Sequence, residues 1–311
     1  MQKKQENTSL VWFRNNLRVH DNLSLKRATG NHVKVIAVYF FDPKIFKIDT
    51  FGFQKTAKYR AKFLIETIND LKKNLSDLNI TLLTYFESPE DCIHKICDTF
   101  LVNNIYTQHE WTKEEVETTN LIKSSCSEKV SFIEDYDQFL YNPKNVSKDF
   151  SNIPNVFTAF RKKLEKTIKV EDEVVISKHS KENLIKNETA IPTLEELGFK
   201  EFTTNLKTAF PFSGGENAAL ERIENYFFET KKVAVYKKTR NGLIGSDYST
   251  KFSPWLANGS LSARTIYWKV RAFEAEFGAN QSTYWVIFEL IWRDYFKYIS
   301  LKYSSKIFKI G

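Results

Sequence analysis

Three hydroxyl residues, a lysine and a phenylalanine occupy five consecutive positions of the sequence: Ser249, Thr250, Lys251, Phe252 and Ser253. They follow two glycines, Gly242 and Gly245, and precede Pro254 and an apolar stretch. A hydroxyl-rich bend that enters a helix offers free backbone N–H groups, side-chain donors and the positive end of a helix dipole, which suits a phosphate or pyrophosphate. The simpler alternative is an ordinary helix start capped by Ser or Thr.

A second group of polar side chains lies near the end of the sequence. Glu289, Trp292 and Arg293 are spaced i, i+3 and i+4, so they share one face of an otherwise apolar helix. Ionised groups on such a helix are costly unless they have partners, which predicts the polar wall of a pocket. The alternative is a Glu–Arg pair within the helix, beside a tryptophan of the core.

Glu110 is a third candidate, in a segment that follows a predicted strand and opens a helix. In an open parallel sheet, ligands bind in the crevice at the carboxyl ends of the strands. A surface carboxylate at a helix start is the alternative. No Gly-x-Gly-x-x-Gly follows the first strand, since residues 14–22 occupy that position, and this argues against an ordinary dinucleotide-binding site.

The elements that must position these residues begin with alternating strands and helices. Apolar runs rich in Val, Ile and Tyr predict strands at 10–13, 33–41, 80–86, 104–107 and 129–133. Helical periodicity predicts helices at 56–78, 89–101 and 113–125. Strands separated by helices of this size imply a parallel sheet covered on both faces, and we place this α/β domain at residues 1–135.

The remainder changes character twice. Residues 136–212 are punctuated by prolines and polar runs, which predicts a connector with short helices such as 155–163; wrapping around the first domain is one path open to it. Residues 213–311 form a helical region, with helices at 218–228, 262–277 and 282–303, and Ser262 as an N-cap. The last helix is apolar nearly all round, so it belongs in the middle of a domain.

Composition limits the class of protein. The 46 basic against 38 acidic side chains give a net charge of +8, which suits a polyanion such as DNA, although scattered lysines also fit an AT-rich coding sequence. Three cysteines without a CxxC pair predict buried thiols in a reducing compartment, and the five histidines form no metal site with them. The polar N-terminus predicts no signal peptide, and no apolar run reaches membrane-spanning length. We therefore expect a cytoplasmic protein.

Five segments together resemble the photolyase/cryptochrome family, and their residues are most similar to those of the DASH cryptochromes. They are VWFRNNLRVHDN at 11–22, YKKTRNGLIG at 236–245, STKFSPWLA at 249–257, GSLSAR at 259–264 and FELIWRDYF at 288–296. The resemblance runs in order over nearly the whole chain. It implies a Rossmann-like α/β antenna domain followed by an all-helical FAD-binding domain, incomplete here.

The resemblance also implies roles for individual residues. FAD is expected to contact Tyr236 and the group Ser249, Thr250, Lys251, Phe252 and Ser253, with Arg293 beside the flavin ring. Glu289 and Trp292 are expected to face the pyrimidine dimer of damaged DNA. Glu110 matches the position that holds a folate antenna, methenyltetrahydrofolate, in members that carry one.

The implied reaction is that of a deoxyribodipyrimidine photo-lyase, in which reduced, light-excited FAD splits a cyclobutane pyrimidine dimer by electron transfer. Flipping out a dimer is easiest in single-stranded DNA, the expected partner of a monomeric protein. The family's helical domain normally continues further, so we expect a C-terminally truncated chain. The alternatives are a light sensor or DNA-binding protein without repair, an inactive fragment that cannot hold FAD, and an unrelated nucleotide-binding protein.

Overall fold

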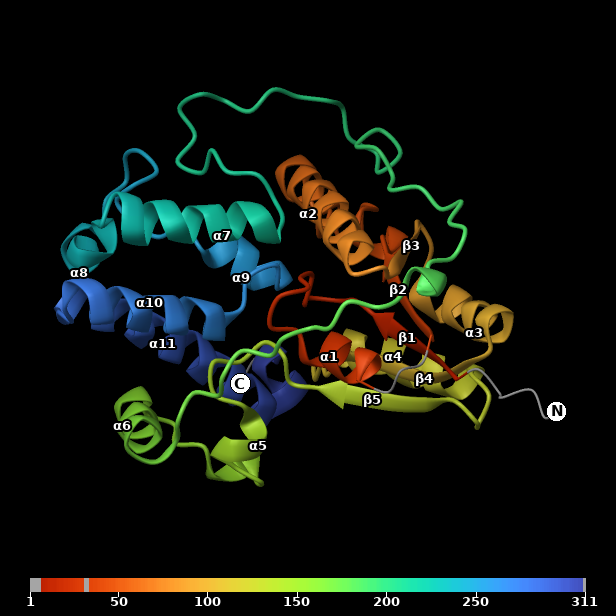
Figure 1. The fold of residues 1–311 in the computed structure, drawn as a ribbon, viewed down its shortest axis with the longest axis horizontal. Coiled ribbons are helices and arrows are strands. Elements are labelled where there is room, and N and C mark those ends of the chain that lie inside the picture. Colours follow the sequence, from red (N-terminus) through yellow and green to blue (C-terminus); the bar gives the residue numbers. More distant parts are fainter. Residues whose placement is uncertain (1–6, 31–33, 310–311) are drawn as a thin grey trace.

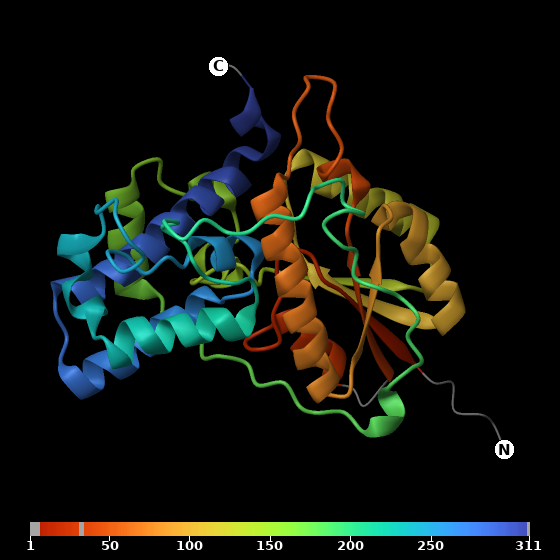
Figure 2. The same ribbon diagram turned by 90° about the horizontal axis from the view of Figure 1, so that it is seen from above.

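The computed structural model describes residues 7–30 and 34–309. A parallel sheet with flanking helices lies beside a body made of helices (Figure 1), and the view from above shows the same two bodies side by side (Figure 2). This is the fold class predicted from the sequence, which is therefore confirmed. The expectation of a leader-free N-terminus concerns mainly residues 1–6, which lie outside the described part of the chain.

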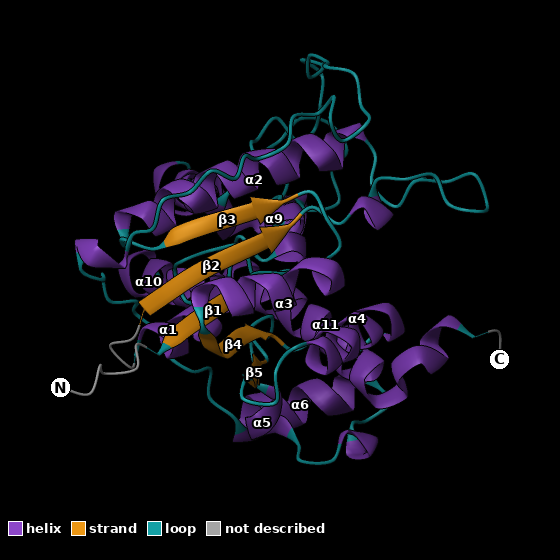
Figure 3. Ribbon diagram, turned by 90° about the vertical axis from the view of Figure 1, so that its right-hand side faces the viewer, coloured by secondary structure: helices purple, strands orange, loops and turns teal. Residues whose placement is uncertain are grey.

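The sheet has the strand order β3-β2-β1-β4-β5, and every neighbouring pair is parallel (Figure 3). Its strands are β1 (Thr8–Trp12), β2 (Lys34–Phe40), β3 (Thr81–Tyr85), β4 (Val102–Gln108) and β5 (Ser131–Asp135). All five were predicted, with bounds that differ by one or two residues; Val33, the expected start of β2, lies outside the described residues. The order reverses at β1, which is where such sheets bind ligands.

Helices cover both faces of the sheet because strand residues alternate sides. Val11 and Phe13 pack with α1 (Leu23–Thr29) and α2 (Lys58–Asp77) on one face. Leu10 and Trp12 pack on the opposite face with α3 (Pro89–Phe100) and α4 (Lys113–Ser125). The bounds of α4 agree with the prediction, whereas α1 was not foreseen, since its seven residues are too few for a clear period.

The segment between the two bodies carries little regular structure. It contains α5 (Pro143–Val146), α6 (Phe157–Thr167) and 3₁₀ turns at Phe150–Asn152 and Lys181–Asn183. Its later part runs along the edge strand β3, where the Thr84 N–H donates to the Thr189 hydroxyl at 2.9 Å, and Figure 1 shows it arching past α2. An edge strand presents unpaired backbone groups, and this strap covers them.

The helical body contains α7 (Glu216–Glu224), α8 (Tyr236–Thr239), α9 (Ser253–Asn258), α10 (Ala263–Phe277) and α11 (Gln281–Tyr303). Ser262 caps α10 as predicted, accepting from the Arg264 N–H at 3.1 Å. The helix predicted at 218–228 is present, but α7 changes to a π turn at Asn225–Glu229, which was not foreseen. Buried rings and aliphatic side chains from α6, α7, α10 and α11 form one shared core.

Candidate functional site

The hydroxyl-rich segment forms an ordered bend before α9. The backbone carbonyls of Ser246, Ser249 and Thr250 all accept hydrogen bonds from the guanidinium of Arg222 on α7. Among the residues that the structure describes, none accepts a hydrogen bond from the backbone N–H groups of residues 249–252. A bend with its carbonyls engaged and successive N–H groups free suits an anion with several oxygens. The link between Arg222 and this bend was not among the sequence predictions.

Tyr236 and Thr250 lie together at the same place. Tyr236 begins α8 and is 8% exposed, as is Thr250, whose hydroxyl lies beside the tyrosine phenol. Burial raises the pKa of Tyr236 to about 12, and the nearby carboxylate of Glu289 adds to the shift. The phenol therefore stays protonated at neutral pH and can donate a hydrogen bond.

The remaining residues of the segment differ in what they can offer. Phe252 is buried and packs with Phe227 at a ring distance of 5.9 Å, so its side chain belongs to the core and only its backbone can reach a ligand. The Lys251 ammonium lies 3.6 Å from the ring centroid of Tyr248. Ser253 is exposed as the first residue of α9. The segment thus presents backbone and hydroxyl groups more than charge.

Glu289 lies on α11 with two partners from outside its expected pair. Its carboxylate accepts from the indole N–H of Trp285 at 3.0 Å, and the Arg240 guanidinium lies 3.0 Å away. The alternative of a Glu289–Arg293 pair within the helix is therefore wrong, since the arginine partner comes from the end of α8. About a third of each side chain stays exposed, 32% for Arg240 and 35% for Glu289, so the carboxylate remains accessible.

Trp292 is part of a stack of rings on the same face. Its indole lies 3.4 Å from Phe157 between ring centroids at an interplanar angle of 11°, and 5.5 Å from Phe296. The tryptophan is half-buried, and Phe296 beyond it is 64% exposed. This face of α11 therefore presents flat apolar surface beside the Glu289 carboxylate, an arrangement suited to a stacked base.

Arg293 links α11 to two other segments of the chain. Its guanidinium donates to the carbonyls of Gln138 at 2.6 Å and Leu256 at 3.1 Å, so it ties α11 to the connector and to α9. Burial lowers the pKa of Arg293, and the neighbouring Asp294 opposes that shift. Through the bond to Leu256, Arg293 holds α9 against α11.

Glu110 lies where β4 ends, at the boundary of the two bodies. Its carboxylate accepts from the Gln108 amide at 2.6 Å and from the Asn15 amide at 3.4 Å. Lys297 of α11 faces it: burial lowers the pKa of Lys297 to about 8, and Glu110 is one of the carboxylates that oppose the shift. Lys297 was not predicted from the sequence. Its position one turn after Arg293, as a charged residue on an apolar helix, was the available signal.

A cavity of about 830 Å³ opens at the carboxyl ends of β1 and β2, in the crevice expected for this sheet. Its walls combine rings, among them Trp12, Tyr39 and Phe63, with cations such as Arg14 and Arg60. Residues of α9 close one side, and Glu110 is not part of the lining. Its size fits a cofactor-sized ligand.

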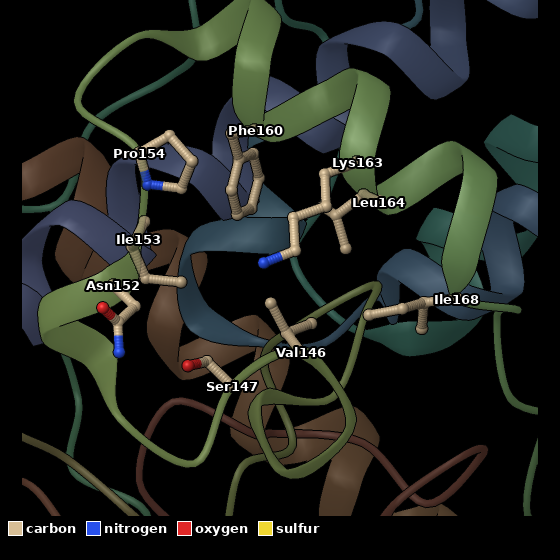
Figure 4. A pocket seen from close by; sticks show the side chains of 9 residues that line it. All are labelled: Val146, Ser147, Asn152, Ile153, Pro154, Phe160, Lys163, Leu164 and Ile168. Atoms are coloured by element: carbon tan, nitrogen blue, oxygen red, sulfur yellow. The ribbon is translucent and has the colours of Figure 1, made fainter.

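A second, much smaller cavity lies between α5 and α6 (Figure 4). Its volume is about 20 Å³, and apolar side chains such as Val146, Phe160 and Leu164 line most of it. That space holds no more than a water molecule. Across residues 7–30 and 34–309, no group of three or more His, Cys, Asp or Glu side chains is arranged to hold a metal ion.

Comparison with known proteins identifies the family to which the chain belongs. The family model for DNA photolyase matches residues 9–179. Cryptochrome DASH of Xenopus laevis is 41% identical over 95% of this chain and 58% of its own length. The chloroplastic/mitochondrial cryptochrome DASH of Solanum lycopersicum is 37% identical over 99% of this chain and 56% of its own length.

A solved structure agrees with these relatives. The cryptochrome of Synechocystis sp. PCC6803 superposes with a TM-score of 0.92 at 35% identity, over 99% of this chain and 64% of that one. The chain thus spans between 56% and 64% of the length of these three proteins. With a family model covering more than half of its residues and this likeness in sequence and structure, the chain belongs to the DNA photolyase/cryptochrome family and is similar to its DASH cryptochromes.

Proposed function

We propose that this chain holds FAD against the bend at residues 246–253 and acts on cyclobutane pyrimidine dimers in single-stranded DNA under blue light. The observation that carries the proposal is one juxtaposition. A bend with free N–H groups at 249–252 adjoins Tyr236, which in turn lies beside Glu289 on the ring-bearing face of α11. The anion site and the base-stacking face therefore lie next to each other.

The residues present fit the pyrophosphate of FAD. Free N–H groups of the bend and the hydroxyls of Ser249, Thr250 and Ser253 are the donors that phosphate oxygens accept. Lys251 adds positive charge nearby, and the protonated phenol of Tyr236 adds one more donor. When bound and reduced, FAD supplies the light-driven electron transfer that opens the dimer. The protein's part is to bind and orient.

On the substrate side, two residues have separate tasks. The Glu289 carboxylate, about a third exposed, can accept hydrogen bonds from the N–H groups of the dimerised pyrimidines, and Arg240 holds it in place. Trp292 stacks on Phe157 and lies next to the exposed ring of Phe296, and together these rings offer apolar surface for a flipped-out base. The net charge of +8 favours a nucleic-acid partner, and we expect the protein to act as a monomer.

There are two alternatives to this proposal. One is a light sensor that binds FAD and DNA without repair. The other is an inert polypeptide that does not retain FAD. The light sensor would retain FAD but not repair dimers, and the inert polypeptide would not retain FAD.

The deciding experiment begins with an absorption spectrum of the purified chain after it is mixed with excess FAD and desalted. A retained flavin band is expected, and Thr250→Val should weaken it while the exposed Thr203→Val leaves it unchanged. Blue light and a single-stranded oligonucleotide with one thymine dimer then test repair. Flavin retention without repair would favour the sensor, and a colourless protein would leave the inert reading.

A folate antenna beside Glu110 belongs to the same proposal. The Glu110 carboxylate can meet the amide-like edge of a folate, and the Lys297 ammonium, which feels that carboxylate, can meet its acidic tail. Titration with methenyltetrahydrofolate, followed by its fluorescence, should show weaker binding for Glu110→Gln. Glu117 lines the larger cavity instead, so a loss of binding in Glu117→Gln would move the antenna there.

We also propose a cytoplasmic location. Its support is the reduced state of Cys92, Cys97 and Cys126, which are buried free thiols. No helix within residues 7–30 and 34–309 is long and apolar enough to cross a membrane. Because one relative is named for chloroplasts and mitochondria, fractionation of the source cells is the test, and recovery in an organelle would overturn this assignment.

A further inference from the structure

Arg222 occupies a position where an arginine is costly. It lies on the core face of α7 with Ala219 and Ile223, and its side chain is 2% exposed. A buried guanidinium is tolerated only when its charge and its N–H groups are satisfied. The partners of Arg222 therefore indicate what this residue is for.

All five guanidinium N–H groups of Arg222 have an acceptor. The Nε donates to the Thr250 carbonyl at 3.2 Å, and Nη2 donates to the carbonyls of Ser246 at 3.2 Å and Ser249 at 3.1 Å. The Nη1 donates to the Asp247 carboxylate at 3.1 Å and to the Asn225 amide oxygen at 3.2 Å. Four of these five acceptors belong to residues 246–250.

Two rings hold the plane of the guanidinium. The centroids of Phe212 and Tyr226 each lie 4.7 Å from the Arg222 Cζ, so the group is fixed by stacking as well as by hydrogen bonds. Asp247 is held from its other side by Lys232. The segment 246–250 is therefore wrapped around a rigid cation.

This wrapping decides which way the backbone faces. Three carbonyls of the bend point to Arg222, and the N–H groups of residues 249–252 stay unpaired within the described chain. The bend continues through Lys251, whose φ of +63° lies in the left-handed region that non-glycine residues avoid. Such a conformation persists only when its surroundings hold it, and Arg222 is the strongest attachment on the preceding residues.

We propose that Arg222 is a positioning residue that presets residues 246–252 as a cradle for the phosphates of the ligand, without itself touching the ligand. The inference rests on the proposed function, since the ligand is FAD there. It goes further in assigning the shape of the cradle to one side chain on another helix, 24 to 28 positions away in sequence. Neither lysine, with three donors, nor methionine, with none, can replace the five-donor fork.

The test compares Arg222→Met and Arg222→Lys with Arg271→Met, in which an exposed arginine of α10 is changed in the same body. The first readout needs no flavin: the rate of trypsin cleavage after Lys251, followed by mass spectrometry, relative to cleavage after the exposed Lys47. We expect the ratio to rise about tenfold in Arg222→Met, less in Arg222→Lys, and not in Arg271→Met.

The second readout compares FAD with riboflavin, which lacks the phosphates. A positioning role lowers the preference for FAD over riboflavin about tenfold in Arg222→Met, whereas a merely structural role weakens both alike. If the wild-type chain binds neither flavin, the proposed function fails, but the cleavage ratio still tests Arg222.

The proposal is overturned if the Lys251 ratio and the flavin preference stay at their wild-type values. It is also overturned if cleavage rises equally at Lys251 and Lys47, because that pattern reports general loosening of the fold. Should Arg222→Met fail to fold, Arg222→Lys keeps the charge and most of the volume and decides by the same two criteria.

Discussion

The Arg240 guanidinium lies 3.0 Å from the Glu289 carboxylate and joins the end of α8 to the middle of α11. The same carboxylate oxygen accepts from Trp285, so it is fixed from two directions. Both partners remain about a third exposed, which keeps the stabilising effect of the pair small. Trp285 and Arg240 thus fix the direction of an accessible carboxylate. This arrangement indicates that Glu289 is oriented toward an external group more than that it stabilises the fold.

Glu289→Gln tests that conclusion. Glutamine keeps the size of the side chain and can still accept from Trp285, but it removes the charge. We expect the free energy of unfolding to change by less than about 1 kcal/mol. The preference for a dimer-containing oligonucleotide over an undamaged one should fall about tenfold, because a charge-assisted hydrogen bond is lost.

The measurement is a pair of binding titrations with single-stranded oligonucleotides that differ only in the dimer. Glu276→Gln, an exposed glutamate of α10, is the matched control and should behave as wild type. An unchanged preference in Glu289→Gln would remove this residue from the substrate site.

Gly259 should tolerate no side chain. A Cβ at this position would lie 1.9 Å from the Asn15 carbonyl oxygen, and its φ of +74° disfavours other residues. We expect Gly259→Ala to reduce the free energy of unfolding by about 3 kcal/mol or more, measured by urea denaturation. Gly198 also has a positive φ, +86°, but open space around it, so Gly198→Ala should cost only about 1 kcal/mol.

The comparison separates the steric clash with Asn15 from the cost of a positive φ, which both positions share. Equal losses would mean that the approach of α9 to the Asn15 loop is not close in solution.

The period and caps of the sequence predicted the elements well, and their packing was harder to foresee. Helix α4 and the Ser262 cap depend on neighbours within a few residues, which a single sequence displays. The π turn after α7 was missed because the apolar spacing of residues 218–228 fits a regular helix equally well. Which i+5 bond replaces an i+4 bond depends on tertiary contacts.

The site residues show the same division. The cluster at 249–253 was visible because its chemistry is local, whereas the roles of Arg222, Arg240 and Lys297 depend on partners far along the chain. One signal was available: Arg222 interrupts an apolar face with Ala219 and Ile223, and a charge in a core position requires acceptors. The acceptors themselves could not be named from the sequence, because loop 246–250 has no period.

Lys297 should produce a measurable pH dependence of stability. Burial lowers its pKa in the folded chain to about 8, below the ordinary lysine value of 10.5. Between these values the unfolded chain binds more protons, so this lysine makes stability rise as pH rises from about 8 toward 10. Because the side chain is partly exposed, we expect a rise of only about 1 kcal/mol relative to Lys297→Met.

Urea unfolding at pH 7, 8, 9 and 10 is the measurement, with the exposed Lys306→Met as control. Glu110→Gln removes a carboxylate that favours the ammonium form, so it should move the rise to lower pH. A wild-type profile parallel to that of Lys297→Met would show that the ammonium is solvated and does not face Glu110.

Asp21 lies at the buried junction of the two bodies. Its carboxylate accepts from the Arg264 guanidinium at 2.7 Å and from the Val174 N–H at 3.1 Å, so it joins the loop after β1 to α10 and to the connector. Asp137 lies 3.5 Å from the same arginine, and both carboxylates are 0% exposed at the side chain. Removing one member of such a network leaves a buried charge with too few partners.

Asp21→Asn is the informative change because asparagine also adopts the left-handed backbone that this position requires, with φ at 53°. The variant therefore removes charge without backbone strain. We expect a loss of about 3–5 kcal/mol in the free energy of unfolding. Asp172→Asn in the exposed part of the connector should cost less than about 0.5 kcal/mol. A loss below about 1 kcal/mol for Asp21→Asn would mean that Asp137 alone compensates Arg264, and the junction would then depend on apolar packing.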